Sequence, residues 1–181
     1  MDKKQSSIGR RLEQSLNSLI ANDYESSLVH FFPALDKTAK LRRPGSKVGV
    51  GERIRGFLKD EEAFISFLAF RIIFENTRFD GVSFPEAIYK FGRTSIMHEG
   101  ELDRRLSFEN VDQIMIVGDT WKLSPSYIAA MITAVMAASE NSQETFISPK
   151  ILHLHGRAVN ANDIWGKKAM LQDFLRMPRR Y

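Results

Sequence analysis

The chain has 181 residues, of which 43% are hydrophobic and 27% charged, the proportions of an ordinary globular domain with its own core. It contains no cysteine, which excludes disulfides, thiolate metal sites, iron–sulfur clusters and cysteine nucleophiles. No apolar run follows the basic N-terminus, and the longest apolar stretches are too short to span a bilayer. We therefore expect a cytoplasmic protein without a membrane segment.

The charge balance of 26 lysines and arginines against 22 acidic residues gives a net charge of +4, which tolerates a polyanionic partner without requiring one. Basic residues gather in three segments: Lys3, Lys4, Arg10 and Arg11; Lys40, Arg42, Arg43 and Lys47; and Arg176, Arg179 and Arg180. Such clusters are most often solvated surface. If the chain binds nucleic acid, we expect Arg42, Arg43, Lys47 and the C-terminal arginines to contact it.

Apolar residues in the N-terminal half recur with the period of amphipathic helices. The pattern predicts helices over residues 8–20 and 24–39, separated by a break and cap at Asn22-Asp23. Pro33 is expected to kink the second helix. The segments that follow are a loop at 42–46, a short helix near 54–58, a longer helix near 64–73 and a connector over 76–83.

A further helix is predicted to begin near Pro85 and to end at Gly100. The period then changes, and three short apolar runs predict strands at Leu106–Phe108, Ile114–Val117 and Trp121–Leu123, with a turn at Gly118-Asp119. The remaining expected elements are an apolar helix from Ser126, a strand over Lys150–His155 and a helix near Asp163–Arg176. The fold class is therefore mainly α with a small β-hairpin insert. We expect one domain over residues 1–181, with an extension from about residue 141.

Two stretches together resemble the HEPN superfamily. They are NDYESSLVHFFPALDKTAK (Asn22–Lys40) and YKFGRTSIMHEGELDRRLSF (Tyr89–Phe108), and the similarity covers roughly Asn22 to Val135. The superfamily signature is an arginine and a histidine separated by four to six residues. Here Arg93 and His98 are separated by four residues.

The resemblance implies a helical bundle that dimerises and brings two motif helices together. It implies a metal-independent endoribonuclease, of a kind that often acts as a toxin or defence effector and is paired with an antitoxin. Many nuclease members carry Asn, Asp or His directly after the arginine, whereas this chain has Thr94. That departure favours the alternative, a catalytically inactive module that binds RNA, a nucleotide or a partner protein. Scaffolding by a homodimer is a third alternative.

The chemistry of the two motif side chains suits RNA cleavage. A histidine can move the proton of the 2′-hydroxyl because its pKa lies near neutrality. An arginine stays ionised and binds phosphate through two parallel hydrogen bonds. A five-residue step turns a regular helix by about 140° and rises about 7.5 Å, so Arg93 and His98 diverge within one chain. A two-fold assembly would let the Arg93 of one subunit face the His98 of the other.

The neighbouring polar residues are candidates for supporting roles. Thr94 and Ser95 can donate hydrogen bonds to phosphate or lie on the helix surface. The alternative to a functional site is that Arg93 and His98 hold the bundle together through Asp36, Glu99 or Glu101. Asp36 stands on an apolar helix, where a carboxylate needs a partner, so an ion pair is expected.

Neither a metal nor a cofactor is expected. His153 and His155 would lie on the same side of a strand, but the sequence offers no clear third ligand near them. His30 stands among apolar residues and is interpreted as a hydrogen-bonded core histidine.

Overall fold

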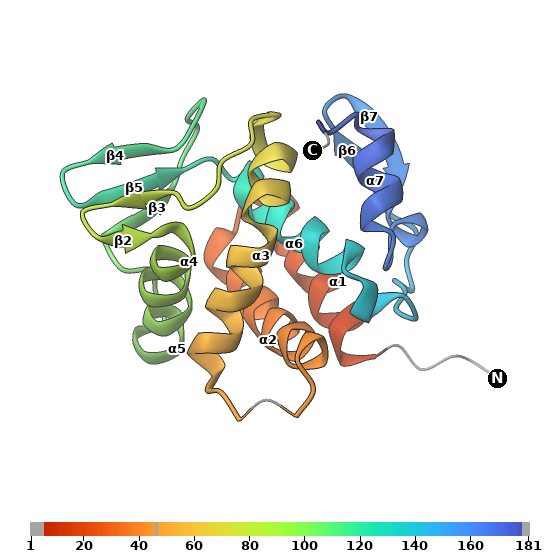
Figure 1. Cartoon of the computed structure of the whole chain (residues 1–181), viewed down its shortest axis with the longest axis horizontal. Coiled ribbons are helices and arrows are strands. Elements are labelled where there is room, and N and C mark those ends of the chain that lie inside the picture. The colour runs from red at the N-terminus through yellow and green to blue at the C-terminus, as the bar shows by residue number, and fades with distance from the viewer. Residues whose placement is uncertain (1–5, 46, 179–181) are drawn as a thin grey trace.

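The computed structural model describes residues 6–45 and 47–178. Lys3, Lys4, Arg179 and Arg180, which belong to the predicted basic clusters, lie outside the described residues. Helices dominate the fold, so the prediction of a mainly α protein is confirmed (Figure 1). The helices are α1 (Ser7–Ile20), α2 (Tyr24–Arg42), α3 (Val50–Phe70), α4 (Phe84–Ala87), α5 (Ser95–Glu99), α6 (Ser126–Ala137) and α7 (Lys168–Phe174), with the π-helix η1 (Ile88–Thr94) between α4 and α5 and the 3₁₀ turns η2 (Ser139–Asn141) and η3 (Ala161–Asp163).

Capping residues begin the first two helices, and the predicted break and cap at Asn22-Asp23 is confirmed. The Ser6 hydroxyl accepts hydrogen bonds from the backbone amides of Ile8 and Gly9, which begins α1. Asn22 adopts a left-handed conformation with φ of 59°, and the Asp23 carboxylate accepts from the amide of Ser26 to begin α2. Helix α2 then continues through Pro33, which is exposed, and ends at Arg42 rather than before it. The predicted loop therefore begins at Arg43.

The prediction of two helices over residues 54–73 is wrong, because α3 is one continuous helix. The charged residues in its middle interrupt the apolar pattern, yet Glu61 and Glu62 are both buried. Glu61 pairs with Arg42 and Lys168, and Glu62 accepts hydrogen bonds from the amides of Asn76 and Thr77. Partners on other elements thus allow these carboxylates to be buried within a helix.

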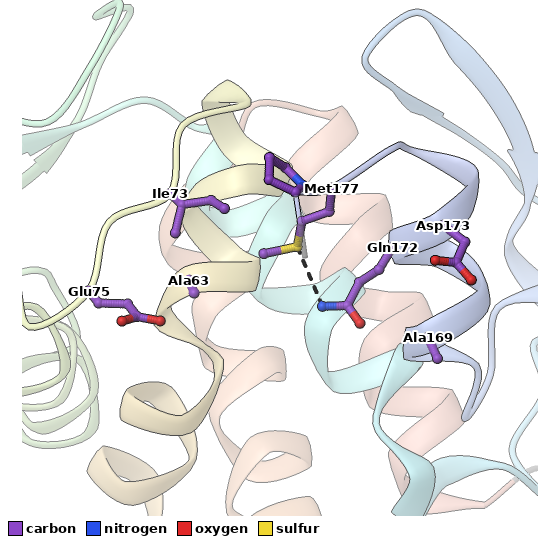
Figure 2. A pocket seen from close by; sticks show the side chains of 8 residues that line it. Ala63, Ile73, Glu75, Ala169, Gln172, Asp173 and Met177 are labelled. Carbon is purple, nitrogen blue, oxygen red and sulfur yellow. Dashed lines mark hydrogen bonds between the residues drawn. The ribbon is translucent and has the colours of Figure 1, made fainter. Parts of the chain in front are cut away.

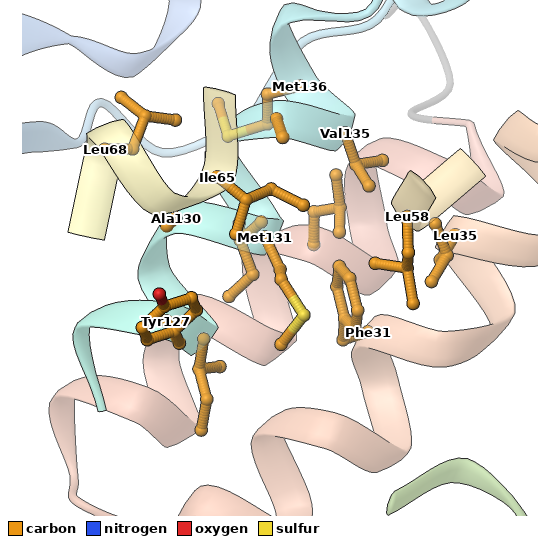
Figure 3. Close-up of a cluster of buried hydrophobic side chains, with 14 of the residues drawn as sticks. Phe31, Leu35, Leu58, Ile65, Leu68, Tyr127, Ala130, Met131, Val135 and Met136 are labelled. Carbon is orange, nitrogen blue, oxygen red and sulfur yellow. The ribbon is translucent and has the colours of Figure 1, made fainter. Parts of the chain in front are cut away.

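The core lies between α1, α2, α3 and α6. Helix α6 is buried on nearly its whole circumference, as expected for a helix that is apolar all round. Figure 3 shows Met131 and Val135 of α6 lying among Phe31, Leu58 and Ile65 from α2 and α3. Within the described residues, no helix combines the length and the apolar character that crossing a bilayer requires.

The β insert is larger than the predicted hairpin. Strands β4 (Met115–Val117) and β5 (Thr120–Leu123) form that antiparallel hairpin, and Gly118 at its turn has a φ of 61°. Strand β3 (Leu106–Phe108) joins β5 in parallel, with Leu106 opposite Trp121, so the sheet order is β3-β5-β4. A small antiparallel hairpin of β1 (Arg78–Phe79) and β2 (Val82–Ser83) occupies the predicted connector.

The C-terminal segment forms a second hairpin and a short helix. Strand β6 (Ile151–Leu154) confirms the predicted strand and pairs with β7 (Arg157–Asn160), which the pattern did not predict. The predicted helix near 163–176 is shorter than expected and corresponds to α7.

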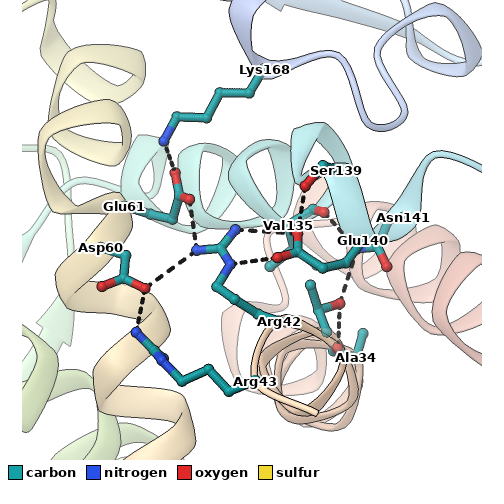
Figure 4. A network of polar contacts seen from close by, with 11 residues as sticks. Ala34, Arg42, Arg43, Asp60, Glu61, Val135, Ser139, Glu140, Asn141 and Lys168 are labelled. Atoms are coloured by element: carbon teal, nitrogen blue, oxygen red, sulfur yellow. Dashed lines mark hydrogen bonds and ion pairs between the residues drawn. The ribbon is translucent and has the colours of Figure 1, made fainter.

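Polar contacts hold this segment to the helical core. Figure 4 shows Arg42 of α2 between Glu61 of α3 and Glu140 of η2, while Lys168 of α7 reaches Glu61 from the other side. The buried Asn141 amide donates to Thr38 Oγ1 and to the carbonyl of Val135. The segment from residue 141 is therefore tied to the bundle by buried hydrogen bonds and ion pairs.

Candidate nucleic-acid interface

The motif helix is not regular. Ser83 and Glu86 form a capping box that begins α4, and the chain then widens into the π-helix η1 before it narrows again in α5. Single π-helical turns within α-helices occur frequently at functional sites. Ile88 and Phe91 of η1 are buried, whereas Tyr89, Lys90 and Arg93 are at least partly exposed. The π-helix therefore presents an aromatic side chain and two cations on the accessible side of the motif helix.

Tyr89 connects the π-helix to α3. Its ring lies against Gly51, because a Cβ added to Gly51 would come within 2.7 Å of the ring. The guanidinium carbon of Arg55, one turn further along α3, lies 5.1 Å from the centroid of the ring. The guanidinium carbon of Arg93 lies 5.9 Å from the same centroid. Tyr89 thus makes cation–π contacts with arginines from two helices.

Two adjoining cavities lie beside this cluster, with volumes of about 410 Å³ and 240 Å³. Both are lined by Arg55 and Glu86, so they meet at these two residues. The larger lies between α3 and the segment from Asn76 to Glu86, and the smaller lies between Tyr89 and the turn at Gly81. We call the two cavities together the Tyr89 groove. Its lining includes Arg55, Lys59, Arg78, Glu86, Tyr89 and Lys90. Arg93 contacts the groove through the Tyr89 ring.

The cations of the Tyr89 groove are largely available to a ligand. Among the described residues, no carboxylate lies within ion-pair distance of Arg55, Lys59, Arg78, Lys90 or Arg93. This differs from Arg42, Arg53 and Arg105, which all have carboxylate partners.

Carboxylates also line the groove, and two of them already accept hydrogen bonds. Glu62 accepts from the amides of Asn76 at 3.0 Å and Thr77 at 2.9 Å. Glu86 Oε2 accepts from both the amide and the hydroxyl of Ser83 at 2.7 Å. The Ser83 hydroxyl and amide lower the pKa of Glu86, with a smaller contribution from the positive charges of Arg78 and Arg55. Glu86 is therefore ionised at neutral pH, and Glu52 stands exposed beside it on α3.

The two motif residues lie in different environments. Arg93 is half-buried beside Tyr89, whereas His98 is exposed in the last turn of α5, just before Gly100 ends the helix with a φ of 81°. Neither residue lines any of the described cavities. Arg93 therefore meets the Tyr89 groove only through its contact with the Tyr89 ring, and His98 lies outside the groove.

The predicted supporting residues do not gather around this pair. Thr94 and Ser95 are half-buried on the motif helix, and Glu99 is exposed. The Asp36 carboxylate is paired with Arg53 rather than with a motif residue, and it accepts two hydrogen bonds from the Arg53 guanidinium at 2.9 and 3.2 Å. The expected ion pair of Asp36 is present, and it joins α2 to α3.

The basic loop divides into a structural part and an exposed part. Arg42 is only 17% exposed, hydrogen-bonds to Glu61 and Glu140, and lies over the Phe57 ring at 4.2 Å. Its guanidinium is therefore occupied within the fold, which argues against the predicted contact with nucleic acid. Arg43 pairs with Asp60 at an exposed position, and Lys47 is exposed. Their predicted role in binding stays a prediction.

The histidines outside the motif do not form a metal site. Within the described part of the chain, no group of three or more metal-ligating side chains comes together. His153 lies in β6, but His155 lies in the following turn with a φ of 51°, so the two do not share one side of a strand.

His155 Nε2 lies 2.9 Å from the carbonyl of Phe67, and burial lowers the pKa of His155. His30 is half-buried with Nδ1 3.3 Å from Arg11, and burial followed by the Arg11 charge lowers its pKa.

A further cavity of about 460 Å³ lies between α3 and α7 (Figure 2). Ala63, Ile73 and Met177 give it apolar walls, and the Gln172 amide lies 3.4 Å from the Met177 sulfur. No residue of the motif or of the Tyr89 groove lines this cavity.

The comparison with known families covers almost the whole chain. The Rv1289 family model matches residues 7–180. The chain belongs to the Rv1289 family. The Rv1289 match continues through the segment beyond residue 141, to which the HEPN resemblance does not extend. No curated protein and no solved structure matches the chain. Nothing in the Rv1289 match refers to HEPN, so that resemblance stays a hypothesis.

Proposed function

We propose that this member of the Rv1289 family binds single-stranded RNA in the Tyr89 groove. The observation that carries the proposal is the contact of Tyr89 with both Arg55 and Arg93, at a groove whose cations have no carboxylate partner within ion-pair distance among the described residues. Proteins that bind single-stranded nucleic acid combine a cationic groove, which follows the phosphates, with aromatic rings on which bases stack. Tyr89 and the surrounding arginines supply both components.

The π-helix supports this assignment. It brings Tyr89, Lys90 and Arg93 to the accessible side while Ile88 and Phe91 anchor the same turn in the core. Arginine is well suited to phosphate because its planar guanidinium donates two parallel hydrogen bonds. The carboxylates of the groove reduce its net positive charge, so we expect moderate affinity that falls steeply with added salt.

Photocrosslinking tests the location directly. A uridine-rich RNA that carries 4-thiouridine should crosslink to peptides that contain Tyr89 or Arg55 after ultraviolet irradiation and protease digestion. Crosslinks confined to the peptide from Arg43 to Lys47 would place the RNA on the basic loop and contradict the proposal. The variant Arg93→Ala should weaken the crosslink, and Arg10→Ala serves as its control, since Arg10 is exposed on α1 and does not line the groove.

The second candidate function is a metal-independent endoribonuclease of the HEPN type, and the exposed surface around His98 favours it. Met97 is 52% exposed directly beside His98. We propose that two copies of the chain meet at this exposed surface. Such a homodimer would bring the His98 of one subunit toward the Arg93 of the other.

In that dimer, His98 would take the proton of the 2′-hydroxyl as this oxygen forms a bond to the phosphorus, while Arg93 held the charge on the scissile phosphate. The P–O5′ bond would break, and the leaving 5′ oxygen would receive the proton from the His98 imidazolium. The products would carry 2′,3′-cyclic phosphate ends, and cleavage would persist in EDTA. Loss of cleavage in EDTA that magnesium or zinc restores would contradict this mechanism. As a free toxin, the protein would slow the growth of its host until a cognate antitoxin bound it, and Arg93→Ala would relieve that effect.

A further inference from the structure

One oxygen of the Glu86 carboxylate has no partner within the described residues. Glu86 Oε2 accepts both hydrogen bonds from Ser83, whereas no hydrogen bond is made by Oε1. Glu86 lines both cavities of the Tyr89 groove, and no described cation lies within ion-pair distance of it. An ionised acceptor therefore lines both cavities of a groove that we assign to RNA.

A carboxylate at this position repels phosphate, so the RNA backbone would not pass over it. It accepts hydrogen bonds from the donors of a base, as Asp and Glu do when they read exposed base edges. Among the four RNA bases, guanine alone presents two adjacent donors, N1–H and N2–H, on its Watson–Crick edge. Its O6 is an acceptor, and it suits the cations beside Glu86.

We propose that the smaller cavity of the Tyr89 groove binds a guanine base of single-stranded RNA, with the one oxygen Oε1 of Glu86 accepting from both N1–H and N2–H. Arg55 or Lys90, which line the same cavity, donates to O6. The volume of about 240 Å³ lies below the usual range for drug-sized ligands, so it suits a single base. Tyr89 forms one wall of this cavity, where it offers a ring for stacking. This inference rests on the proposed function and adds base specificity to it.

Because of the capping box, Glu86→Gln can test the role of the Glu86 carboxylate without removing the N-terminal cap of α4. A glutamine at this position can still accept from the Ser83 amide, so α4 keeps its N-terminal cap. Its amide NH₂ would then present donors to the cavity in place of an acceptor. The side chain keeps its size while its hydrogen bonding toward guanine is inverted.

The experiment measures the affinity of uridine-rich heptanucleotides that differ only at the central base. Wild type should bind the central guanine about tenfold more tightly than adenine, cytosine or uracil, the effect of one charge-assisted hydrogen-bonded contact. Glu86→Gln should bring this ratio to about one, even if the loss of a negative charge strengthens binding to every heptanucleotide. Glu101→Gln, which removes an exposed carboxylate that does not line the groove, should keep the tenfold ratio.

The possible results separate the two proposals. Equal binding of all four RNAs by wild type would overturn the guanine assignment and leave RNA binding intact. A guanine preference that survives Glu86→Gln would also overturn the role of Glu86. Failure of wild type to bind any of the heptanucleotides at low salt would overturn the proposed function, and this inference with it.

Discussion

The Tyr89 ring lies so close to Gly51 that a Cβ on Gly51 would come within 2.7 Å of its Cζ atom. Gly51 belongs to the first turn of α3, and Tyr89 belongs to the π-helix, so the contact sets the separation of these two elements. The same ring lies beside Arg55 and Arg93. The absence of a side chain at residue 51 therefore determines where the aromatic wall of the groove can stand.

The variant Gly51→Ala should displace Tyr89 and weaken RNA binding. The added methyl group overlaps a ring rather than the end of a flexible chain, so we expect the ring to move away from the position in which it can stack on a base. The affinity for single-stranded RNA should fall about tenfold, the lower part of the range for one stacked base. Fluorescence anisotropy with a labelled uridine-rich RNA measures this change.

The matched control is Gly49→Ser. A Cβ on Gly49 meets no atom within 4 Å, and serine is a good N-cap for α3, which begins after this residue. RNA binding by Gly49→Ser should equal that of wild type. If Gly51→Ala also binds like wild type, Tyr89 does not contact the RNA.

Much of the helical framework could be predicted because periodicity and caps coincide. Asp23, Pro85 and Gly100 mark helix ends in the sequence, and all three do so in the structure. The continuity of α3 could not be predicted. In the sequence, Glu61 and Glu62 interrupt the apolar pattern and suggest an exposed turn, because the partners that allow their burial are unknown from the sequence alone. Those partners are Arg42, Lys168 and the amides of residues 76 and 77, which are brought close only by the tertiary fold.

Arg42 and Arg43 are adjacent in sequence but should respond very differently to replacement. Arg42→Ala leaves Glu61, which is 3% exposed, with Lys168 as its remaining ion-pair partner, and should lower the free energy of unfolding by about 3 kcal/mol. Arg43→Ala breaks only an exposed pair with Asp60 and should cost less than about 1 kcal/mol. Urea denaturation measures both values. Equal effects from the two variants would contradict the structural role of Arg42.

Asp103 should contribute a pH-dependent part of the stability. Hydrogen bonds from the Arg105 guanidinium lower the pKa of Asp103 to about 2, below the unfolded value of about 3.9. The contribution is therefore fully present above about pH 4 and is lost as the pH falls toward 2. Because both side chains are partly exposed, we expect about 1 kcal/mol.

The check compares wild type with Asp103→Asn by urea denaturation at several pH values. The difference in unfolding free energy should be constant near neutrality and should shrink as the pH approaches 2. A difference that stays constant down to this pH would show that Asp103 is not held by Arg105.

Co-refolded variants test whether Arg93 and His98 form a shared catalytic site. If the site lies across two subunits, Arg93→Ala and His98→Ala should each abolish metal-independent cleavage. A mixed dimer keeps one intact Arg93 and one intact His98, so part of the activity should return when the two variants are co-refolded. Gel electrophoresis of RNA incubated in EDTA provides the measurement. Full activity of wild type that sediments as a monomer would contradict the shared site.

The site could be predicted only in part. The motif indicated Arg93, which contacts Tyr89, but the contact between Arg55 and Tyr89 could not be inferred, because α3 and the motif helix meet only in the tertiary structure. The π-helix could not be predicted either, since η1 keeps the apolar spacing of an ordinary helix at Ile88 and Phe91. The cluster of basic residues in the loop predicted a contact with nucleic acid, yet the Arg42 guanidinium is paired with Glu61 and Glu140.

The salt dependence of RNA binding tests the central claim most directly. The dissociation constant of a labelled single-stranded RNA would be measured from about 50 to about 200 mM salt for wild type, Arg55→Ala, Arg93→Ala and an Arg43→Ala/Lys47→Ala double variant. Removing Arg55 or Arg93 should weaken binding and reduce the slope of log K against log salt by about 0.7 for each phosphate that the variant no longer neutralises. The loop variant should bind as wild type does. The opposite pattern, an unchanged slope for both groove variants and a reduced slope for the loop variant, would contradict RNA binding in the Tyr89 groove.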